Sequence, residues 1–257
     1  MNRIDLAFEH TQERLLNVYF TAGYPELEDT VRIAESLEKA GAHILEIGLP
    51  YSDPIADGPT IQESSTHAIN NGMSLKKLFQ QLSALREKVT IPVILMGYLN
   101  PIIQFGIEKF CEKCEEVGID GLILPDLPMY EYEKIYKPLF EAHKLFNIFL
   151  ITPQTSEERI RKIDDLSSGF IYMVSSASIT GAKSDISEAQ IQYFNRVNSM
   201  NLKNRRLIGF GISNKSTFDS ACNYASGAIV GSAFIKQLTV DSSKEAINNF
   251  VHQILEK

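Results

Sequence analysis

Short apolar runs alternate with helix-like segments eight times along this chain. Several runs are apolar at nearly every position, which is typical of strands buried on both faces of a parallel sheet. Eight alternations without a linker predict an α/β fold, a single (β/α)8 TIM barrel over residues 1–257. A doubly wound open sheet is the alternative, but no GxGxxG motif opens its first turn. The predicted strands are residues 17–21, 43–47, 92–96, 121–124, 147–151, 169–174, 206–210 and 227–230.

The residues ahead of the first strand predict an extra N-terminal helix. Within residues 2–15, Ile4, Phe8, Thr11 and Leu15 fall on one stripe at helical spacing. We therefore expect an amphipathic helix that packs this stripe against the barrel.

Composition and charge exclude several classes of partner. The net charge of −7, with the acids scattered, argues against a nucleic-acid groove or an anionic membrane surface. No apolar run approaches the roughly 20 residues of a membrane span, and the first residues lack the apolar core of a secretion signal. Cys111, Cys114 and Cys222 do not suggest a disulfide framework. These features predict a cytoplasmic protein.

Glycines gather after the last predicted strands. Gly211 follows the seventh strand, Gly231 and Ser232 follow the eighth, and Thr180 and Gly181 lie in the loop after the sixth. Backbone N–H groups at glycines can approach an anion closely, and the loops after strands seven and eight of barrels commonly bind phosphate. Tight turns alone are the alternative. The pattern favours a phosphate site, although no Walker lysine indicates a nucleoside triphosphate.

The stretch over residues 45–62 places one acid inside a predicted strand and another in the loop before the next helix. Glu46 lies inside the predicted strand, and Asp57 lies in the turn-rich loop before a helix predicted to begin at Pro59. No lysine and no histidine cluster falls at a strand's carboxyl end, which leaves proton transfer by carboxylates as the indicated chemistry. Glu46 could instead form a structural ion pair, and Asp57 could cap the helix.

The same stretch, LEIGLPYSDPIADGPTIQ, resembles the pattern LE(L/I)G(V/I)P(F/Y)SDP(L/V/I)ADGP(T/V)IQ of the tryptophan synthase alpha chain family. Further matches to the family follow in order and cover nearly the whole chain. They lie at residues 20–25, 96–101, 121–128, 180–182, 209–212 and 230–233.

The resemblance implies a retro-aldol cleavage of indole-3-glycerol phosphate to indole and glyceraldehyde 3-phosphate. It implies a beta chain as partner, in an alpha2-beta2 heterotetramer, to which indole passes through a tunnel. The beta chain would hold pyridoxal phosphate, so we expect no cofactor and no metal on this chain. Another phosphosugar barrel enzyme, or a non-catalytic barrel kept as a partner of a beta chain, are the alternatives.

The resemblance also implies roles for single residues. Glu46 matches the family's glutamate that moves protons to and from the substrate, and Asp57 matches the aspartate that accepts the indole N–H. Tyr172 matches a supporting tyrosine near Glu46. Further positions match the indole pocket and the phosphate site: Phe20, Ile61, Tyr98 and Leu99 for the indole, and Thr180, Gly181, Gly211, Gly231 and Ser232 for the phosphate.

One loop departs from the family pattern. Where the family often has SRxGVTG after the sixth strand, this chain has Ser176 in place of the arginine and Ser178 in place of the glycine. The change bears on loop closure and on coupling to a beta chain. It does not touch Glu46 or Asp57.

Overall fold

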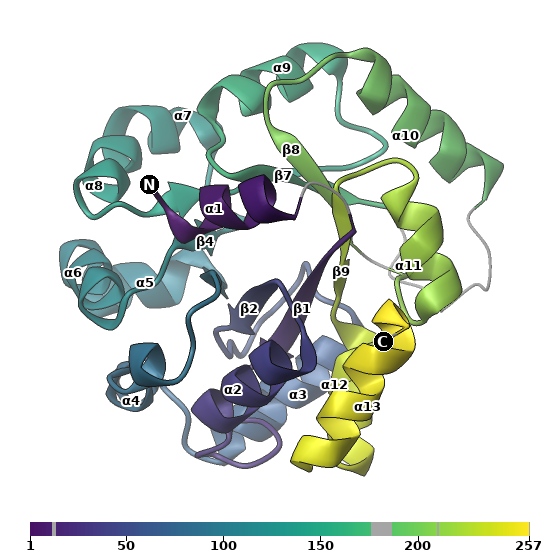
Figure 1. Ribbon diagram of the computed structural model, residues 1–257. Coiled ribbons are helices and arrows are strands. Elements are labelled where there is room, and N and C mark those ends of the chain that lie inside the picture. Colours follow the sequence, from purple (N-terminus) through teal and green to yellow (C-terminus); the bar gives the residue numbers. More distant parts are fainter. Residues whose placement is uncertain (12–13, 176–186, 210, 257) are drawn as a thin grey trace.

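The computed structural model describes residues 1–11, 14–175, 187–209 and 211–256. Its parallel strands form one sheet in the order β5-β4-β3-β2-β1-β9-β8-β7-β6, surrounded by helices (Figure 1). The strands are β1 Leu15–Thr21, β2 Ile44–Gly48, β3 Val93–Met96, β4 Gly121–Ile123, β5 Phe146–Asn147, β6 Leu150–Ile151, β7 Phe170–Val174, β8 Arg205–Gly209 and β9 Gly227–Val230.

The sheet closes into a barrel through β5 and β6, which are consecutive in the chain. Between them, the Ile148 N–H donates to the Leu122 carbonyl oxygen at 2.9 Å, and the Tyr172 N–H donates to the Phe149 carbonyl oxygen at 2.9 Å. Residues 146–151 therefore pair with β4 on one side and with β7 on the other. The predicted strand over 147–151 thus appears as two short strands, and the predicted barrel, rather than an open sheet, is confirmed.

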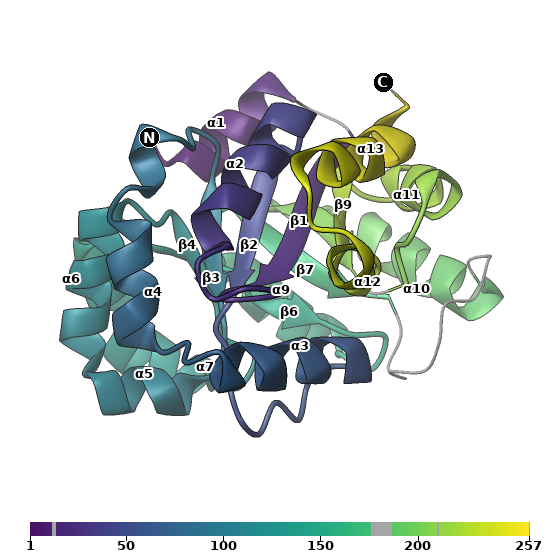
Figure 2. The ribbon, with the colours of Figure 1, turned by 90° about the horizontal axis from the view of Figure 1, so that it is seen from below.

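The helices cover the outside of the sheet, apart from α1 (Figures 1 and 2). In the described ranges, none of them has the length and apolar character needed to cross a membrane. They are α1 Arg3–His10, α2 Thr30–Ala40, α3 Pro59–Asn70, α4 Leu75–Leu82, α5 Leu99–Phe105, α6 Ile107–Val117, α7 Met129–Glu131, α8 Lys137–Ala142, α9 Glu157–Leu166, α10 Glu188–Ser199, α11 Lys215–Cys222, α12 Ser232–Val240 and α13 Lys244–Leu255.

Helix α1 closes the amino end of the barrel. Its Ile4 and Phe8 pack in one buried cluster with the inward residues of the strands, among them Leu15 and Ile44. The prediction of a helix over residues 2–15 was wrong beyond His10. Thr11 has extended backbone angles, and Leu15 belongs to β1, where it points into the barrel.

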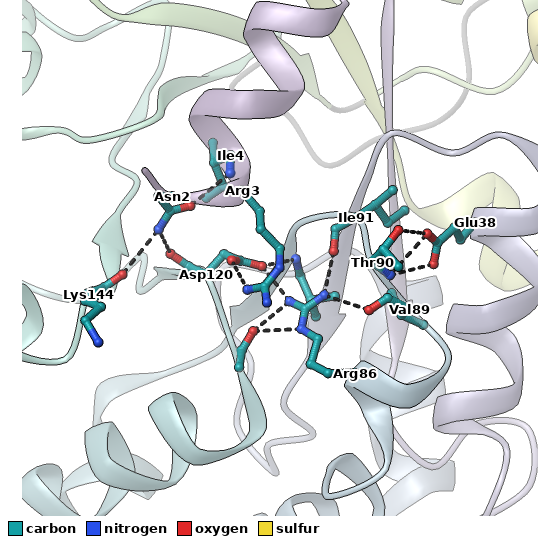
Figure 3. A network of polar contacts seen from close by, with 12 residues as sticks. Asn2, Arg3, Ile4, Glu38, Arg86, Val89, Thr90, Ile91, Asp120 and Lys144 are labelled. Atoms are coloured by element: carbon teal, nitrogen blue, oxygen red, sulfur yellow. Dashed lines mark hydrogen bonds and ion pairs between the residues drawn. The ribbon is translucent and has the colours of Figure 1, made fainter.

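A polar network fixes α1 to the same end of the barrel (Figure 3). The Asp120 carboxylate accepts from Arg3 Nη1 at 2.9 Å, from Arg86 Nη2 at 2.6 Å and from the Val93 N–H at 2.8 Å. The Asp120 carbonyl oxygen accepts from Asn2 Nδ2 at 2.9 Å. Because Asn2 is the N-cap of α1 and Arg3 its first residue, Asp120 joins this helix to β3 and to the start of β4.

Candidate functional site

Glu46 lies inside the barrel, in the middle of β2. Ile44 belongs to the inner cluster, so Glu46, two residues on, points to the same interior. It is fully buried, and its Oε1 accepts a hydrogen bond from Asn17 Nδ2. Oε2 has no hydrogen-bond partner in the described part of the chain. One oxygen of this carboxyl group is therefore fixed by a hydrogen bond, and the other remains available to a ligand.

Burial controls the protonation of Glu46. Desolvation raises its pKa to about 8, while the hydrogen bond from Asn17 lowers it. No cation is among the causes of the shift, so the structure does not support the alternative of a structural ion pair. Near neutral pH the carboxyl group is mostly protonated, which suits a group that first gives a proton and then takes one.

Asp57 lies in the loop between β2 and α3, at the carboxyl end of the barrel. Figure 2 shows this loop and α1 at opposite ends of the molecule. The predicted helix start is confirmed, since Pro59 is the first residue of α3 and Gly58 is the N-cap without a side-chain cap bond. Asp57 does not cap this helix. Its Oδ2 accepts instead from the Tyr98 hydroxyl at 3.1 Å.

The two carboxyl groups differ in their proton affinity. Desolvation raises the pKa of Asp57 to about 6, and the hydrogen bond from Tyr98 lowers it. Asp57 is thus mostly ionised near neutral pH, where Glu46 is mostly protonated. Two acids whose environments separate their pKa values in this way can take an acid role and a charge-stabilising role in one reaction.

Tyr98 connects the end of β3 to the Asp57 loop. Its hydroxyl accepts from the Ala56 N–H at 2.9 Å while donating to Asp57. Its ring packs on Tyr51, with the two centroids 5.1 Å apart. The sequence predicted Tyr98 as a pocket wall. The structure adds that it holds the loop, a contact that only the adjacency of β2 and β3 produces.

Two tyrosines from β1 and β7 face the carboxylates. Burial and then the nearby Glu46 and Asp57 charges raise the pKa of Tyr172. Burial also raises the pKa of Tyr19, again with contributions from both acids. Each ring packs directly against a glycine, where no other residue would leave room for it. A Cβ added at Gly209 would lie 2.2 Å from the Tyr172 hydroxyl oxygen, and a Cβ added at Gly48 would lie 2.1 Å from the Tyr19 hydroxyl oxygen. The predicted Tyr172 is therefore placed beside the acids.

Phe20 does not lie in the pocket that the sequence assigned to it. Leu15, Asn17 and Tyr19 take the inward positions of β1, so the alternation of side chains turns Phe20 outward. It is fully buried among the residues that join the strands to the helices. The inward position beside Glu46 belongs to Tyr19, which sequence reasoning missed and the two-residue period of β1 could have indicated.

The other two predicted pocket residues lie at the carboxyl end of the barrel. Ile61 lies in the first turn of α3 and Leu99 begins α5, and each is 8% exposed. The Leu99 N–H donates to both carboxylate oxygens of Asp126, at 3.0 and 3.1 Å. Asp126 thus fixes the start of α5 at this end of the barrel.

Backbone donors for an anion gather after β8 and β9. Gly211 follows β8 with φ +82°, a conformation that favours glycine. Gly231 is the N-cap of α12, which begins at Ser232, and it offers no side-chain cap. The first N–H groups of a helix lack intrahelical partners and attract anions. Since β8 and β9 are neighbours, these loops lie at the same end.

Part of the predicted phosphate site lies outside the described residues. Thr180 and Gly181 fall in the range 176–186, as do Ser176 and Ser178, the positions that depart from the family pattern. Their roles stay predictions.

The cysteines do not form a metal centre. Cys111 and Cys114 are buried on α6, and burial raises the pKa of Cys111 to about 12, so its thiol stays protonated. Across the described ranges, no group of three or more His, Cys, Asp or Glu side chains is placed to hold a metal ion. The expectation of a reaction without a metal stays a prediction.

Comparison with known proteins assigns this barrel to a family. The model of the family described as tryptophan synthase alpha chain matches residues 7–256. The chain belongs to this family. The tryptophan synthase alpha chain of Flavobacterium psychrophilum is 58% identical over 99% of this chain and 100% of its own length. That of Christiangramia forsetii is 56% identical over 99% of this chain and 98% of its own.

Solved structures agree with the assignment. A structure of Mycobacterium tuberculosis tryptophan synthase matches with a TM-score of 0.90 and 28% identity, over 99% of this chain and 97% of that one. The tryptophan synthase alpha chain from Legionella pneumophila subsp. pneumophila matches with a TM-score of 0.88 and 31% identity, over 100% of this chain and 97% of that one. The fold of the chain is therefore the TIM barrel of the family.

Proposed function

We propose that this chain cleaves indole-3-glycerol phosphate to indole and glyceraldehyde 3-phosphate, with Glu46 and Asp57 as its catalytic residues. Family membership supports the reaction. The observation that carries the residue assignment is the state of Glu46, a fully buried carboxyl group with a pKa of about 8 and one unpartnered oxygen. A lyase of this kind needs such a group, because one proton must be added and another removed on the two sides of the same carbon–carbon bond.

Glu46 moves the protons. Cleavage of the bond between indole C3 and the glycerol chain requires a proton at C3 and loss of a proton from the neighbouring side-chain hydroxyl. Protonated Glu46 gives its proton to C3. The bond breaks, its electron pair returns to the ring, and the hydroxyl becomes the aldehyde as its proton passes to the Glu46 carboxylate. The enzyme thus ends in its starting protonation state.

Asp57 and the tyrosines support this step. Ionised Asp57 accepts the indole N–H and stabilises the positive charge that develops on the protonated ring. Tyr98 holds Asp57 by its 3.1 Å hydrogen bond. Tyr172 takes a supporting role beside both acids. Tyr19, Ile61, Tyr98 and Leu99 form the walls for the indole ring.

The phosphate end of the substrate binds on the other side of the barrel mouth. Backbone N–H groups at Gly211, Gly231 and Ser232, with the start of α12, supply the donors. Thr180 and Gly181, which the resemblance assigns to the same site, are the further phosphate contacts of the proposal. Because this anchor is fixed, the indole end of the substrate is directed toward Glu46 and Asp57.

A beta chain is the proposed partner, in an alpha2-beta2 heterotetramer to which indole passes. Pyridoxal phosphate belongs to the beta chain, and no step on this chain draws on a cofactor. The proposal includes one domain over residues 1–257 and a cytoplasmic location, without nucleic-acid or membrane partners. Apolar side chains at the carboxyl end support docking there: Ile55 is 85% exposed, Ile103 51% and Tyr130 63%, after β2, β3 and β4 in turn.

Changing Ile55 to glutamate should weaken binding to a beta chain by about tenfold or more, since the variant places a charge in an apolar contact. Isothermal titration of the beta chain into each variant measures this. Val240→Glu is the matched control, because Val240 is 86% exposed, like Ile55, but ends α12 and lies in none of the loops after β2, β3 and β4. Equal affinities for the Ile55→Glu and Val240→Glu variants would place the interface elsewhere.

The proposed reaction is tested by indole release. Purified chain is incubated with indole-3-glycerol phosphate, with and without a beta chain, beside the Glu46→Gln variant. We expect slow release by the chain alone, faster release with the partner and none above background from the variant. If neither condition yields indole, the barrel acts on a different phosphorylated substrate.

A further inference from the structure

Asn17 is the one hydrogen-bond partner of the Glu46 carboxyl group in the described ranges. It lies on β1, fully buried, one inward position before Tyr19. In the sheet it pairs with Ile44 of β2 and with Ile229 of β9, both members of the apolar inner cluster. Tyr19 is paired with Glu46, so Asn17 reaches Glu46 along the diagonal between the two strands.

The surroundings of Asn17 favour an apolar side chain. Leu15, Ile44 and Ile229 would pack well against a leucine at this position. Burial of an amide among them costs free energy unless its polar atoms are bonded. Yet the Asn17 Oδ1 has no hydrogen-bond partner among the described residues, so the Nδ2 contact to Glu46 is the only bond that offsets this cost. The amide therefore serves Glu46 rather than the packing of the barrel.

We propose that Asn17 is a positioning residue for Glu46, which fixes Oε1 through its amide N–H and leaves Oε2 as the oxygen that exchanges the proton. The inference rests on the proposed function, because it takes Glu46 as the proton carrier. Oε2 is unpartnered in the described part of the structure, as a proton-exchanging atom must be before substrate binds. A carboxyl group held at one oxygen keeps its other oxygen in a defined direction.

Asn17 also sets the proton affinity of Glu46. The titratable groups that face Glu46 are Tyr19 from β1 and Tyr172 from β7, and burial raises the pKa of both, so they stay neutral phenols. The Asn17 N–H bonds to the charged form of Glu46 and lowers its pKa against the effect of burial. Without this donor, the pKa of Glu46 must move further up from about 8.

The test compares Asn17→Leu with Asn147→Leu in the full chain. Asn147 is also a buried asparagine of the sheet, but its neighbours Phe146 and Ile148 point inward, so Asn147 points outward, away from Glu46. The pKa of Glu46 is read by NMR titration of protein labelled with 13C at the glutamate carboxyl carbon, without substrate. The Glu46 signal is the one absent from Glu46→Gln. Asn17→Ala, which adds no bulk, is measured alongside.

We expect the Asn17 variants to raise the pKa of Glu46 by about one unit, with kcat lowered about tenfold and KM nearly unchanged. Asn147→Leu should leave both the pKa and kcat at their wild-type values. An unchanged Glu46 titration in the Asn17 variants, or the same shift in Asn147→Leu, would overturn the inference. Because the titration needs no turnover, lack of indole release by the wild-type chain would contradict the proposed reaction without deciding the contact between Asn17 and Glu46.

Discussion

Changing Glu46 to glutamine should lower the rate of indole release by about 10²- to 10⁴-fold, the range that a positioned acid or base contributes. Glutamine has nearly the same shape and can keep a contact with Asn17, but it carries no exchangeable acid proton. The Glu46 side chain is fully buried, and glutamine fills the same space without supplying an acid. Substrate binding should change little, because the proposed phosphate anchor lies after β8 and β9.

Rate and binding must be measured together for this prediction. Indole release gives the rate, and equilibrium titration with an analogue that lacks the reacting hydroxyl gives the affinity. Glu245→Gln is the control, since Glu245 is an exposed glutamate on the outer helix α13 and not on a strand of the barrel. If Glu46→Gln still releases indole at close to the wild-type rate, Glu46 is a structural acid and the proton carrier must be another group.

The barrel could be predicted because its buried strands appear in the sequence as short apolar runs. A strand buried on both faces is mostly apolar, and eight short apolar runs are visible, several of them apolar at nearly every position. The residues at which helices and strands begin and end were harder to predict. The amphipathic pattern continues to Leu15, but the helix stops at His10, since Thr11 is extended and Arg14 has φ 63°. An apolar residue at helical spacing can equally be the first inward residue of a strand, and here Leu15 is.

Some residues of the candidate site could be predicted from the sequence and others could not. Glu46 and Asp57 were singled out because no lysine and no histidine cluster falls at a strand's carboxyl end, and the resemblance then gave them roles. Phe20 was placed in the pocket although the alternation of β1 turns it outward in favour of Tyr19. Asn17 gave no signal at all, because one polar residue in a strand acquires meaning only when the register of β1 against β2 is known.

The amino end of the barrel, opposite the candidate site, should contribute much of the stability of the fold. We expect the largest loss of stability from a single substitution there at Asp120. Changing Asp120 to alanine should lower the free energy of unfolding by about 3–5 kcal/mol, as when one partner of a buried ion pair is removed. The Asp120 side chain is 4% exposed and that of Arg86 19%. The change removes the acceptor of the Val93 N–H, takes the carboxylate partner from Arg86 and frees Arg3 at the start of α1. In the described ranges, Arg86 then keeps only backbone carbonyl oxygens as acceptors, those of Gly118, Val89 and Ile91.

Urea unfolding followed by circular dichroism measures this loss, with Asp219→Ala as the matched control. Asp219 also accepts from an arginine, Arg14 at 2.6 Å, but both side chains are substantially exposed, at 33% and 47%, so its loss should cost about 1 kcal/mol or less. Equal losses in the two variants would mean that Asp120 does not hold α1 in place. A larger loss for Asp120→Ala, with the pKa of Glu46 retained, would show that the amino end stabilises the barrel independently of the chemistry at its carboxyl end.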